Sequence, residues 1–380
     1  MGIPFIDLAA QQARIRPEID RAVARVLDHG QYILGPEVAE LEGQLAVFSG
    51  SAHCLSCANG TDALQLALMA LGIGAGDAVF VPSFTFAATA EVVPLVNATP
   101  VFVDVLPDTF NMDPESLKRA IAHAKDQGLR PAAIIPVDLF GLPADFQALT
   151  PIAREAGMAV IDDAAQGFGA LYHNRRVGSL ADITTTSFFP AKPLGCYGDG
   201  GAVFTDSDEL AALIDSFRIH GKGSHKYFNE RVGINSRLDT LQAAILIEKM
   251  KLYEEEISLR EKVAQRYSRR LAGAFEVPFI PQGLTSVWAQ YTIVTSGAAE
   301  RTALQEACSK AGVPTVIYYP MPLHHQKAYA HFPADPAGLK VSEALCDKVL
   351  SLPMHPYLEE DVQDRIVDTL IGAKSRSAAA

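Results

Sequence analysis

Short apolar runs alternate with amphipathic helical patterns from residue 37 to about residue 205, and this alternation constrains the fold most. Strand-like runs such as Val79–Pro82 and Val101–Val103 precede helical segments such as Pro114–Lys125, which has proline at its first position. This order predicts an α/β fold with a largely parallel sheet covered by helices on both faces. Ligands of such folds bind at the carboxyl ends of the strands.

The remaining elements extend this pattern into two domains. We expect a large domain over residues 1–250 and a smaller C-terminal α+β domain over residues 251–380. A long helical stretch rich in Glu, Lys and Arg links them, and the tail from Ser375 is expected to be disordered. The further expected elements are strands at His53–Cys57, Ala133–Val137, Ala159–Ile161, Ile183–Ser187 and Ala202–Phe204, and helices at Leu64–Leu71, Thr89–Val96, Ala144–Glu155, Leu238–Leu271 and Ala303–Ala311.

Composition excludes several classes of function. The 380 residues carry a net charge of −12, whereas nucleic acids and anionic membranes require a basic surface, so neither is an expected partner. There is no signal-peptide pattern and no apolar run near the roughly 20 residues of a membrane helix, so we expect a cytoplasmic protein. Cys54-x-x-Cys57 has metal-ligand spacing but no second pair, and no metal site is predicted.

A single lysine stands in an uncharged, aromatic setting in the segment Ser187-Phe188-Phe189-Pro190-Ala191-Lys192-Pro193-Leu194-Gly195. Apolar surroundings favour the neutral amine, which can act as a nucleophile and form a Schiff base with an aldehyde. The alternative is a loop lysine whose stem packs on the two phenylalanines. This segment alone does not decide between the two interpretations.

A pair of aspartates, Asp162 and Asp163, follows the apolar run at Ile161 and precedes small residues and Gln166. A carboxylate at a strand end can pair with a protonated ring nitrogen and so stabilise an electron sink. Only one of the two can point inward, because side chains alternate along a strand. The alternative is a helix N-cap, a position that Asp often occupies.

Two further segments follow predicted strands. Asn59-Gly60-Thr61-Asp62 opens a helix, and the free amides of a first helical turn bind anions such as phosphate, although a plain helix cap is the alternative. Phe84-Thr85-Phe86 could stack on an aromatic ligand or pack in the core. A phosphate cradle, a stacking ring, a strand-end carboxylate and an activated lysine together predict pyridoxal 5'-phosphate as the cofactor.

With these motifs the sequence resembles the DegT/StrS-type nucleotide-sugar aminotransferases over about Ile3 to Leu370. The resemblance implies the aspartate aminotransferase fold and a Schiff base on Lys192. It assigns Asp163 to the ring nitrogen, Gln166 to the phenolic oxygen and Phe86 to ring stacking. It also implies a homodimer with shared active sites. The residues it assigns to the phosphate are Gly60, Thr61, Asp62, Ser187 and the partner subunit's Asn235; those it assigns to the substrate are Tyr32, Arg237, Tyr318, Tyr319 and His324.

The resemblance also indicates the reaction and the substrate class. Lys192-Pro193-Leu194-Gly195-Cys196-Tyr197 is similar to enzymes that move an amino group from L-glutamate to carbon 3 of a UDP-linked 3-keto N-acetylglucosamine uronate, for surface polysaccharide synthesis. Those enzymes tend to have His-Tyr-Pro at Tyr318-Tyr319-Pro320, whereas Tyr-Tyr-Pro is familiar from enzymes for dTDP-linked 3-keto-6-deoxyhexoses. Arg237 is the candidate partner for a sugar carboxylate, with His324, His325 and Lys222 as reserves.

Two other activities occur on this fold. Related dehydratases have histidine in place of the Schiff-base lysine, and the presence of Lys192 argues against that reaction. A cofactor-binding regulator usually carries an added DNA-binding region, for which an acidic chain of this length has no room. The sequence therefore predicts an aminotransferase.

Overall fold

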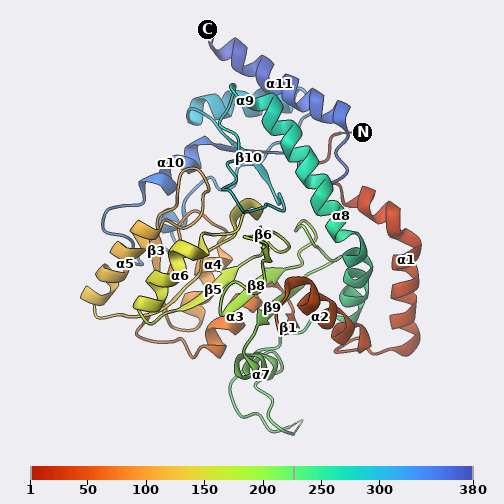
Figure 1. Cartoon of the computed structure of the whole chain (residues 1–380), viewed down its shortest axis with the longest axis vertical. Coiled ribbons are helices and arrows are strands. Elements are labelled where there is room, and N and C mark those ends of the chain that lie inside the picture. The colour runs from red at the N-terminus through yellow and green to blue at the C-terminus, as the bar shows by residue number, and fades with distance from the viewer. Residues whose placement is uncertain (1, 226, 379–380) are drawn as a thin grey trace.

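The centre of the molecule is a seven-stranded sheet with the strand order β1-β9-β8-β5-β4-β2-β3 (Figure 1). The computed structural model describes residues 2–225 and 227–378. All neighbouring pairs from β8 to β3 are parallel, and β9 runs antiparallel to both of its neighbours. The strands of this sheet are β1 (His53–Cys57), β2 (Asp77–Pro82), β3 (Thr99–Val103), β4 (Arg130–Ile134), β5 (Ala159–Asp163), β8 (Ile183–Ser187) and β9 (Gly201–Thr205).

Helices cover both faces of this sheet, which confirms the predicted α/β class. One face packs against α3 (Gly60–Ala70), α4 (Ala88–Leu95) and α7 (Asp208–Phe217). The opposite face packs against α5 (Pro114–Asp126) and α6 (Phe146–Glu155) over the parallel strands, and against α2 (Pro36–Ser49) near β9. Because both faces are covered, the strands are nearly continuous apolar runs, as expected from the sequence.

Local signals in the sequence explain where several helices begin. Asn59 caps α3, since its side-chain oxygen accepts a hydrogen bond of 2.8 Å from the backbone N–H of Asp62. Asp113 caps α5 in the same way, and Pro114 occupies its first turn. The strand predicted at Ala133–Val137 is instead Arg130–Ile134, and Val137 forms only an isolated bridge to Asp163.

The long helix α8 (Thr240–Leu271) joins two hydrophobic cores and lies alongside α1 (Leu8–His29) (Figure 1). Its first half packs on the core near β9, and its second half packs in a separate C-terminal core. The proposed domain boundary at residue 250 falls within this helix. The C-terminal elements are β10 (Tyr291–Val294), α9 (Ala298–Lys310), α10 (Lys340–Lys348), β11 (Val349–Leu352) and α11 (Glu360–Ala378).

The C-terminus differs from the expectation of a disordered tail from Ser375. Helix α11 continues to Ala378, and Ser375 donates a hydrogen bond to the carbonyl of Ile371 one turn earlier. Only residues 379–380 of that tail lie outside the described part of the chain. Within the described residues, no helix combines the length and the apolar character needed to cross a membrane.

Candidate active site

Several of the predicted functional residues gather at one edge of the sheet, where the parallel strands end. Asp163 is the last residue of β5, and Ser187 is the last residue of the neighbouring β8. The antiparallel β9 begins at this edge with Gly201, and α3 begins here with Gly60. The topology therefore places a carboxylate, a hydroxyl and a helix N-terminus side by side, as expected for a ligand site of an open parallel sheet.

Lys192 lies in the loop between β8 and β9 at this edge. Backbone hydrogen bonds hold the loop: Lys192 N–H donates to the carbonyl of Phe189 at 2.8 Å, and Cys196 N–H donates to that of Phe188 at 2.8 Å. Burial lowers the pKa of the Lys192 amine, and the nearby carboxylate of Asp163 opposes that shift. The amine is thus less basic than an exposed lysine, which favours the nucleophilic form.

Asp163, rather than Asp162, is the aspartate that interacts with Lys192. Burial raises the pKa of the Asp163 carboxyl, while hydrogen bonds from Thr89 and Ala165 N–H and the charge of Lys192 lower it. Asp162 points to the opposite face of the sheet and is fully buried, with one carboxylate oxygen bonded only to Thr184 and the other unpartnered within the described chain. The structure therefore selects Asp163 from the pair.

A cradle for an anion forms where α3 meets β8 and β9. A side chain at Gly60 would place its Cβ only 2.7 Å from the Cβ of Ser187, so the helix start and the serine can be neighbours only with glycine there. A Cβ at Gly201 would lie 2.5 Å from the backbone of Asn59. The first turn also carries Thr61 and Asp62. This set of amides and hydroxyls has the chemistry that binds a phosphate group.

Gln166 is almost fully buried and makes two hydrogen bonds. Its Oε1 accepts the backbone N–H of Phe140 at 2.8 Å, and its Nε2 donates to the hydroxyl of Tyr319 at 3.2 Å. Tyr319 was predicted to bind substrate, and the structure places it beside a predicted cofactor residue. Phe86, in contrast, is 57% exposed just before α4, so its ring is free to stack on a ligand, whereas Phe84 is buried in the core.

The predicted residues of the segment before α8 lie at the surface near the start of α3. Ser236 accepts a hydrogen bond of 3.0 Å from the N–H of Ala58, which brings this segment close to the cradle. Asn235 is exposed and accepts a hydrogen bond from the guanidinium of Arg237. Tyr32 is 47% exposed in the connection between α1 and α2, and its carbonyl bonds to the first residue of α8.

His324 and Tyr318 have protein partners of their own. The Nδ1 of His324 lies 2.7 Å from the hydroxyl of Ser83, and its Nε2 lies 3.2 Å from Glu343. Tyr318 packs edge-on against Phe5, with ring centroids 6.4 Å apart. Both of the His324 ring nitrogens are therefore committed within the chain, which leaves Arg237 as the better candidate for a substrate carboxylate.

Two contributors to the site were not identified from the sequence. Thr89, in the first turn of α4, donates to Asp163, and the backbone N–H of Phe140 orients Gln166. A hydroxyl in a helix and a peptide N–H in a turn carry no sequence signal of a role in binding. Only the contact between segments far apart in the chain reveals them.

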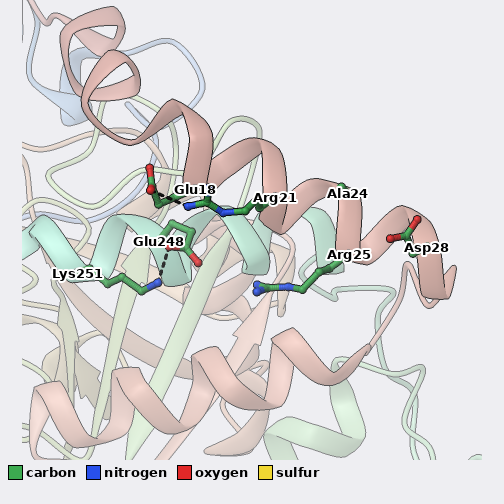
Figure 2. Close-up of a pocket in the computed structure, with 7 residues that line it drawn as sticks. All are labelled: Glu18, Arg21, Ala24, Arg25, Asp28, Glu248 and Lys251. Carbon is green, nitrogen blue, oxygen red and sulfur yellow. Dashed lines mark hydrogen bonds and ion pairs between the residues drawn. The ribbon is translucent and has the colours of Figure 1, made fainter.

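A separate hollow of about 430 Å³ lies between α1 and α8, away from this set of residues (Figure 2). Figure 2 shows that two of its cations are already paired, Arg21 with Glu18 and Lys251 with Glu248. The hollow contains none of the residues assembled at the sheet edge. We therefore place the candidate active site at the sheet edge, where the residues fit a phosphate, a ring nitrogen and an aldehyde.

Comparison with known proteins identifies the family of the chain. The model of the DegT/DnrJ/EryC1/StrS aminotransferase family matches residues 13–371. The chain is 52% identical over 358 residues, or 94% of its length and 96% of the relative's, to a UDP-2-acetamido-2-deoxy-3-oxo-D-glucuronate aminotransferase of Pseudomonas aeruginosa. It is 39% identical over 370 residues, covering 97% of the chain and 95% of the relative, to a dTDP-3-amino-3,4,6-trideoxy-alpha-D-glucose transaminase of Streptomyces venezuelae.

Solved structures show the same fold. A DegT DnrJ EryC1 StrS aminotransferase from Brucella abortus superposes with a TM-score of 0.95 at 53% identity, covering 97% of this chain and 99% of that one. The protein ntda of Bacillus subtilis, solved with its cofactor PMP bound, superposes with a TM-score of 0.88 at 32% identity, covering 98% of this chain and 85% of that one. The predicted aspartate aminotransferase-type fold and its cofactor are thereby confirmed.

Proposed function

Because the chain belongs to the DegT/DnrJ/EryC1/StrS aminotransferase family, we propose that it moves an amino group from L-glutamate to carbon 3 of a UDP-linked 3-keto N-acetylhexosaminuronate. The relative from Pseudomonas aeruginosa at 52% identity is named for an amino transfer of this kind. The amino sugar would serve the synthesis of surface polysaccharide. The cofactor is pyridoxal 5'-phosphate, as in the family.

The electrostatic interaction between Lys192 and Asp163 at the sheet edge carries the amino-transfer part of this proposal. When bound, the cofactor supplies the electron sink and holds the amino group between the two substrates. Lys192 would hold the cofactor through its Nζ, and the free amine of the same residue would accept a proton from one carbon and return it to another. Asp163 supplies a negative charge that keeps the ring nitrogen protonated, and the cradle of Gly60, Thr61 and Ser187 holds the phosphate.

Arg237 is the residue that we propose for a carboxylate at carbon 6 of the sugar. The guanidinium of Arg237 donates to the side chain of Asn235, and its Nε is buried without a partner among the described residues. A buried sugar carboxylate requires a cationic partner, since an unpaired charge is costly. His324 and His325 already lie 3.2 Å and 3.7 Å from Glu343, which makes them weaker candidates.

A dTDP-linked 3-keto-6-deoxyhexose is the alternative substrate. Tyr318 and Tyr319 offer hydroxyl groups rather than the imidazole expected in uronate enzymes, and hydroxyls suit a neutral sugar equally well. The transaminase of Streptomyces venezuelae, at 39% identity, is named for a sugar of the dTDP-linked type. The two candidate substrates differ in the nucleotide and in the group at carbon 6 of the sugar, whereas the amino transfer is the same for both.

Exposed hydrophobic side chains on the described part of the chain are consistent with a homodimer. Phe86, Phe189, Phe228 and Val232 are each more than half exposed. Large apolar side chains exposed in a single chain can become buried when two copies associate. We propose that a second copy of the chain covers them and that Asn235 of the partner subunit approaches the phosphate while Arg237 of the partner subunit approaches the sugar.

A substrate panel tests the proposed reaction. Glutamate should remove the absorbance of the lysine-bound cofactor and be released as 2-oxoglutarate. UDP-linked 3-keto uronates, dTDP-linked 3-keto sugars and 4-keto sugars are then added separately, and recovery of that absorbance is measured. We expect recovery with the UDP-linked 3-keto uronate. Recovery with a 4-keto sugar alone would disprove transfer at carbon 3, and recovery with a dTDP-linked sugar alone would disprove the uronate.

A further inference from the structure

A backbone hydrogen-bond donor fixes the orientation of the side-chain amide of Gln166. The backbone N–H of Phe140, 2.8 Å away, can only donate a hydrogen bond, so the atom of Gln166 that faces it must be the oxygen. The NH₂ group consequently faces the other way, toward Tyr319. Amide oxygen and nitrogen are hard to distinguish in structures, but here the fixed donor settles the assignment.

The turn that presents this N–H is strained and firmly held. Phe140 lies within the short 3-10 turn Leu139–Gly141 with φ of 58°, a left-handed conformation that is costly for a residue with a side chain. Asn111 binds both sides of the turn, accepting from Leu139 N–H at 3.2 Å and donating to the carbonyl of Leu142 at 3.1 Å. The Phe140 ring packs edge-on against Phe110, with centroids 5.5 Å apart.

Tyr319 provides the second constraint on the amide. Its hydroxyl oxygen accepts a hydrogen bond of 3.2 Å from Nε2 of Gln166, and its ring packs edge-on against Phe84 with centroids 5.9 Å apart. Burial raises the pKa of the Tyr319 phenol well above its usual value, so the phenol stays neutral at all working pH values. One Nε2–H is thus engaged by Tyr319, and the remaining Nε2–H has no acceptor among the described residues.

We propose that Tyr319 and the Leu139–Gly141 turn are a positioning device that aims the remaining Nε2–H of Gln166 at the cofactor. The device rests on the proposed role of Gln166 at the phenolic oxygen of pyridoxal 5'-phosphate. A donor at that oxygen stabilises its ionised form and thereby lowers the pKa of the chromophore on Lys192. Strain at Phe140 has a function in this arrangement, because it accompanies a turn whose peptide N–H donates to the side-chain oxygen of Gln166.

The pKa of the lysine-bound chromophore, measured by absorbance during a pH titration without any substrate, tests the proposal. Tyr319→Phe removes one hydroxyl and keeps the ring, and we expect it to raise the chromophore pKa by about half a unit, the size of losing part of one hydrogen bond. Tyr318→Phe is the matched control, since that hydroxyl has no contact with Gln166 and should leave the pKa unchanged. Gly141→Ala displaces the same turn, because its Cβ would lie 2.8 Å from Trp288 N, and should act like Tyr319→Phe.

A double-mutant cycle separates positioning from a direct effect of Tyr319. In a Gln166→Ala background, Tyr319→Phe should have no further effect on the chromophore pKa, because the amide through which it acts is gone. An equal shift in both backgrounds, or no shift in the wild-type background, would overturn the proposal. If Gly141→Ala fails to fold, the two tyrosine variants decide the matter. No sugar is used, so a failure of the proposed substrate in the panel above leaves this result unaffected.

Discussion

The hydroxyl of Thr89 donates a hydrogen bond of 2.8 Å to Oδ2 of Asp163. Thr89 is in the first turn of α4 and Asp163 ends β5, so the bond joins two segments 74 residues apart. Both side chains are buried. The bond stabilises the charged carboxylate, which burial alone would disfavour, and it leaves Asp163 able to pair with a ring nitrogen.

Thr89→Val should raise the acid limit of cofactor binding, that is, the pH below which the protein loses its cofactor. The pKa of Asp163 is already raised by burial, and loss of the Thr89 bond raises it further. If Asp163 pairs with the ring nitrogen only when ionised, as proposed, the variant should lose cofactor at a higher pH than the wild type as the pH falls. At high pH both forms are ionised and the difference should shrink. Cofactor retention after gel filtration, at several values between about pH 5 and 8, measures this effect.

Thr85→Val is the matched control for that experiment. Its hydroxyl lies 3.2 Å from that of Thr89 but makes no hydrogen bond to Asp163. We expect its acid limit to match that of the wild type within error. A Thr89→Val protein with an unchanged acid limit would show that this hydroxyl does not tune the carboxylate.

Asp163→Asn and Asp162→Asn should differ sharply in activity. The first removes the charge beside Lys192 and should lower kcat by about 10²-fold or more, the size typical of a lost preorganised electrostatic contact. The second changes a carboxyl on the opposite face of the sheet, where burial and the neighbouring Asp138 and Asp163 raise its pKa. It should keep most of the rate. Steady-state kinetics of both variants measure the difference, and the reverse order would show that the wrong aspartate was chosen.

Lys192→Ala should abolish turnover while some cofactor remains bound through the phosphate and the ring. The substitution deletes both the attachment point and the base that moves the proton, and general base catalysis alone contributes about 10²–10⁴-fold. Borohydride reduction of the wild type should attach the cofactor to Lys192, as peptide mass mapping would reveal. Lys125→Ala, which changes an exposed lysine of α5 outside the proposed site, is the control and should keep the wild-type rate. Cofactor trapped on any other lysine would refute the assignment.

The position of the candidate site could be predicted from the sequence, because the carboxyl ends of parallel strands meet at the same edge of the sheet. Apolar runs located β2, β3, β5, β8 and β9 to within a few residues, and the residues after them became neighbours in space. The strand at residues 133–137 was displaced because Pro136 and Val137 extend the apolar run beyond the last residue of β4. An apolar run marks burial, and burial continues past the point where strand pairing stops.

Contacts between side chains could not be predicted in the same way. Alternation along β5 required one of Asp162 and Asp163 to face the site, but it could not say which one. The position of Lys192 between β8 and β9 decides that choice in the folded chain. Likewise, the pairing of His324 with Glu343 depends on where α10 packs, which no local pattern specifies.

The proposed sharing of the active site between two subunits can be tested by mixing variant chains. If the partner subunit's Arg237 serves the site that contains Lys192, a mixture of Lys192→Ala and Arg237→Ala chains forms hybrid dimers in which one site has both residues intact. Such a mixture should regain part of the activity that each variant lacks alone, up to about a quarter of the wild-type rate for random pairing of equal amounts.

A mixture of Lys192→Ala and Asp163→Asn chains is the control, because both of these residues belong to the half of the site that one chain supplies. One chain of such a hybrid retains Lys192 and the other retains Asp163, so no site is complete and activity should stay low. Activity in the first mixture no higher than in the second would exclude the shared site, as would a fully active monomer in analytical ultracentrifugation.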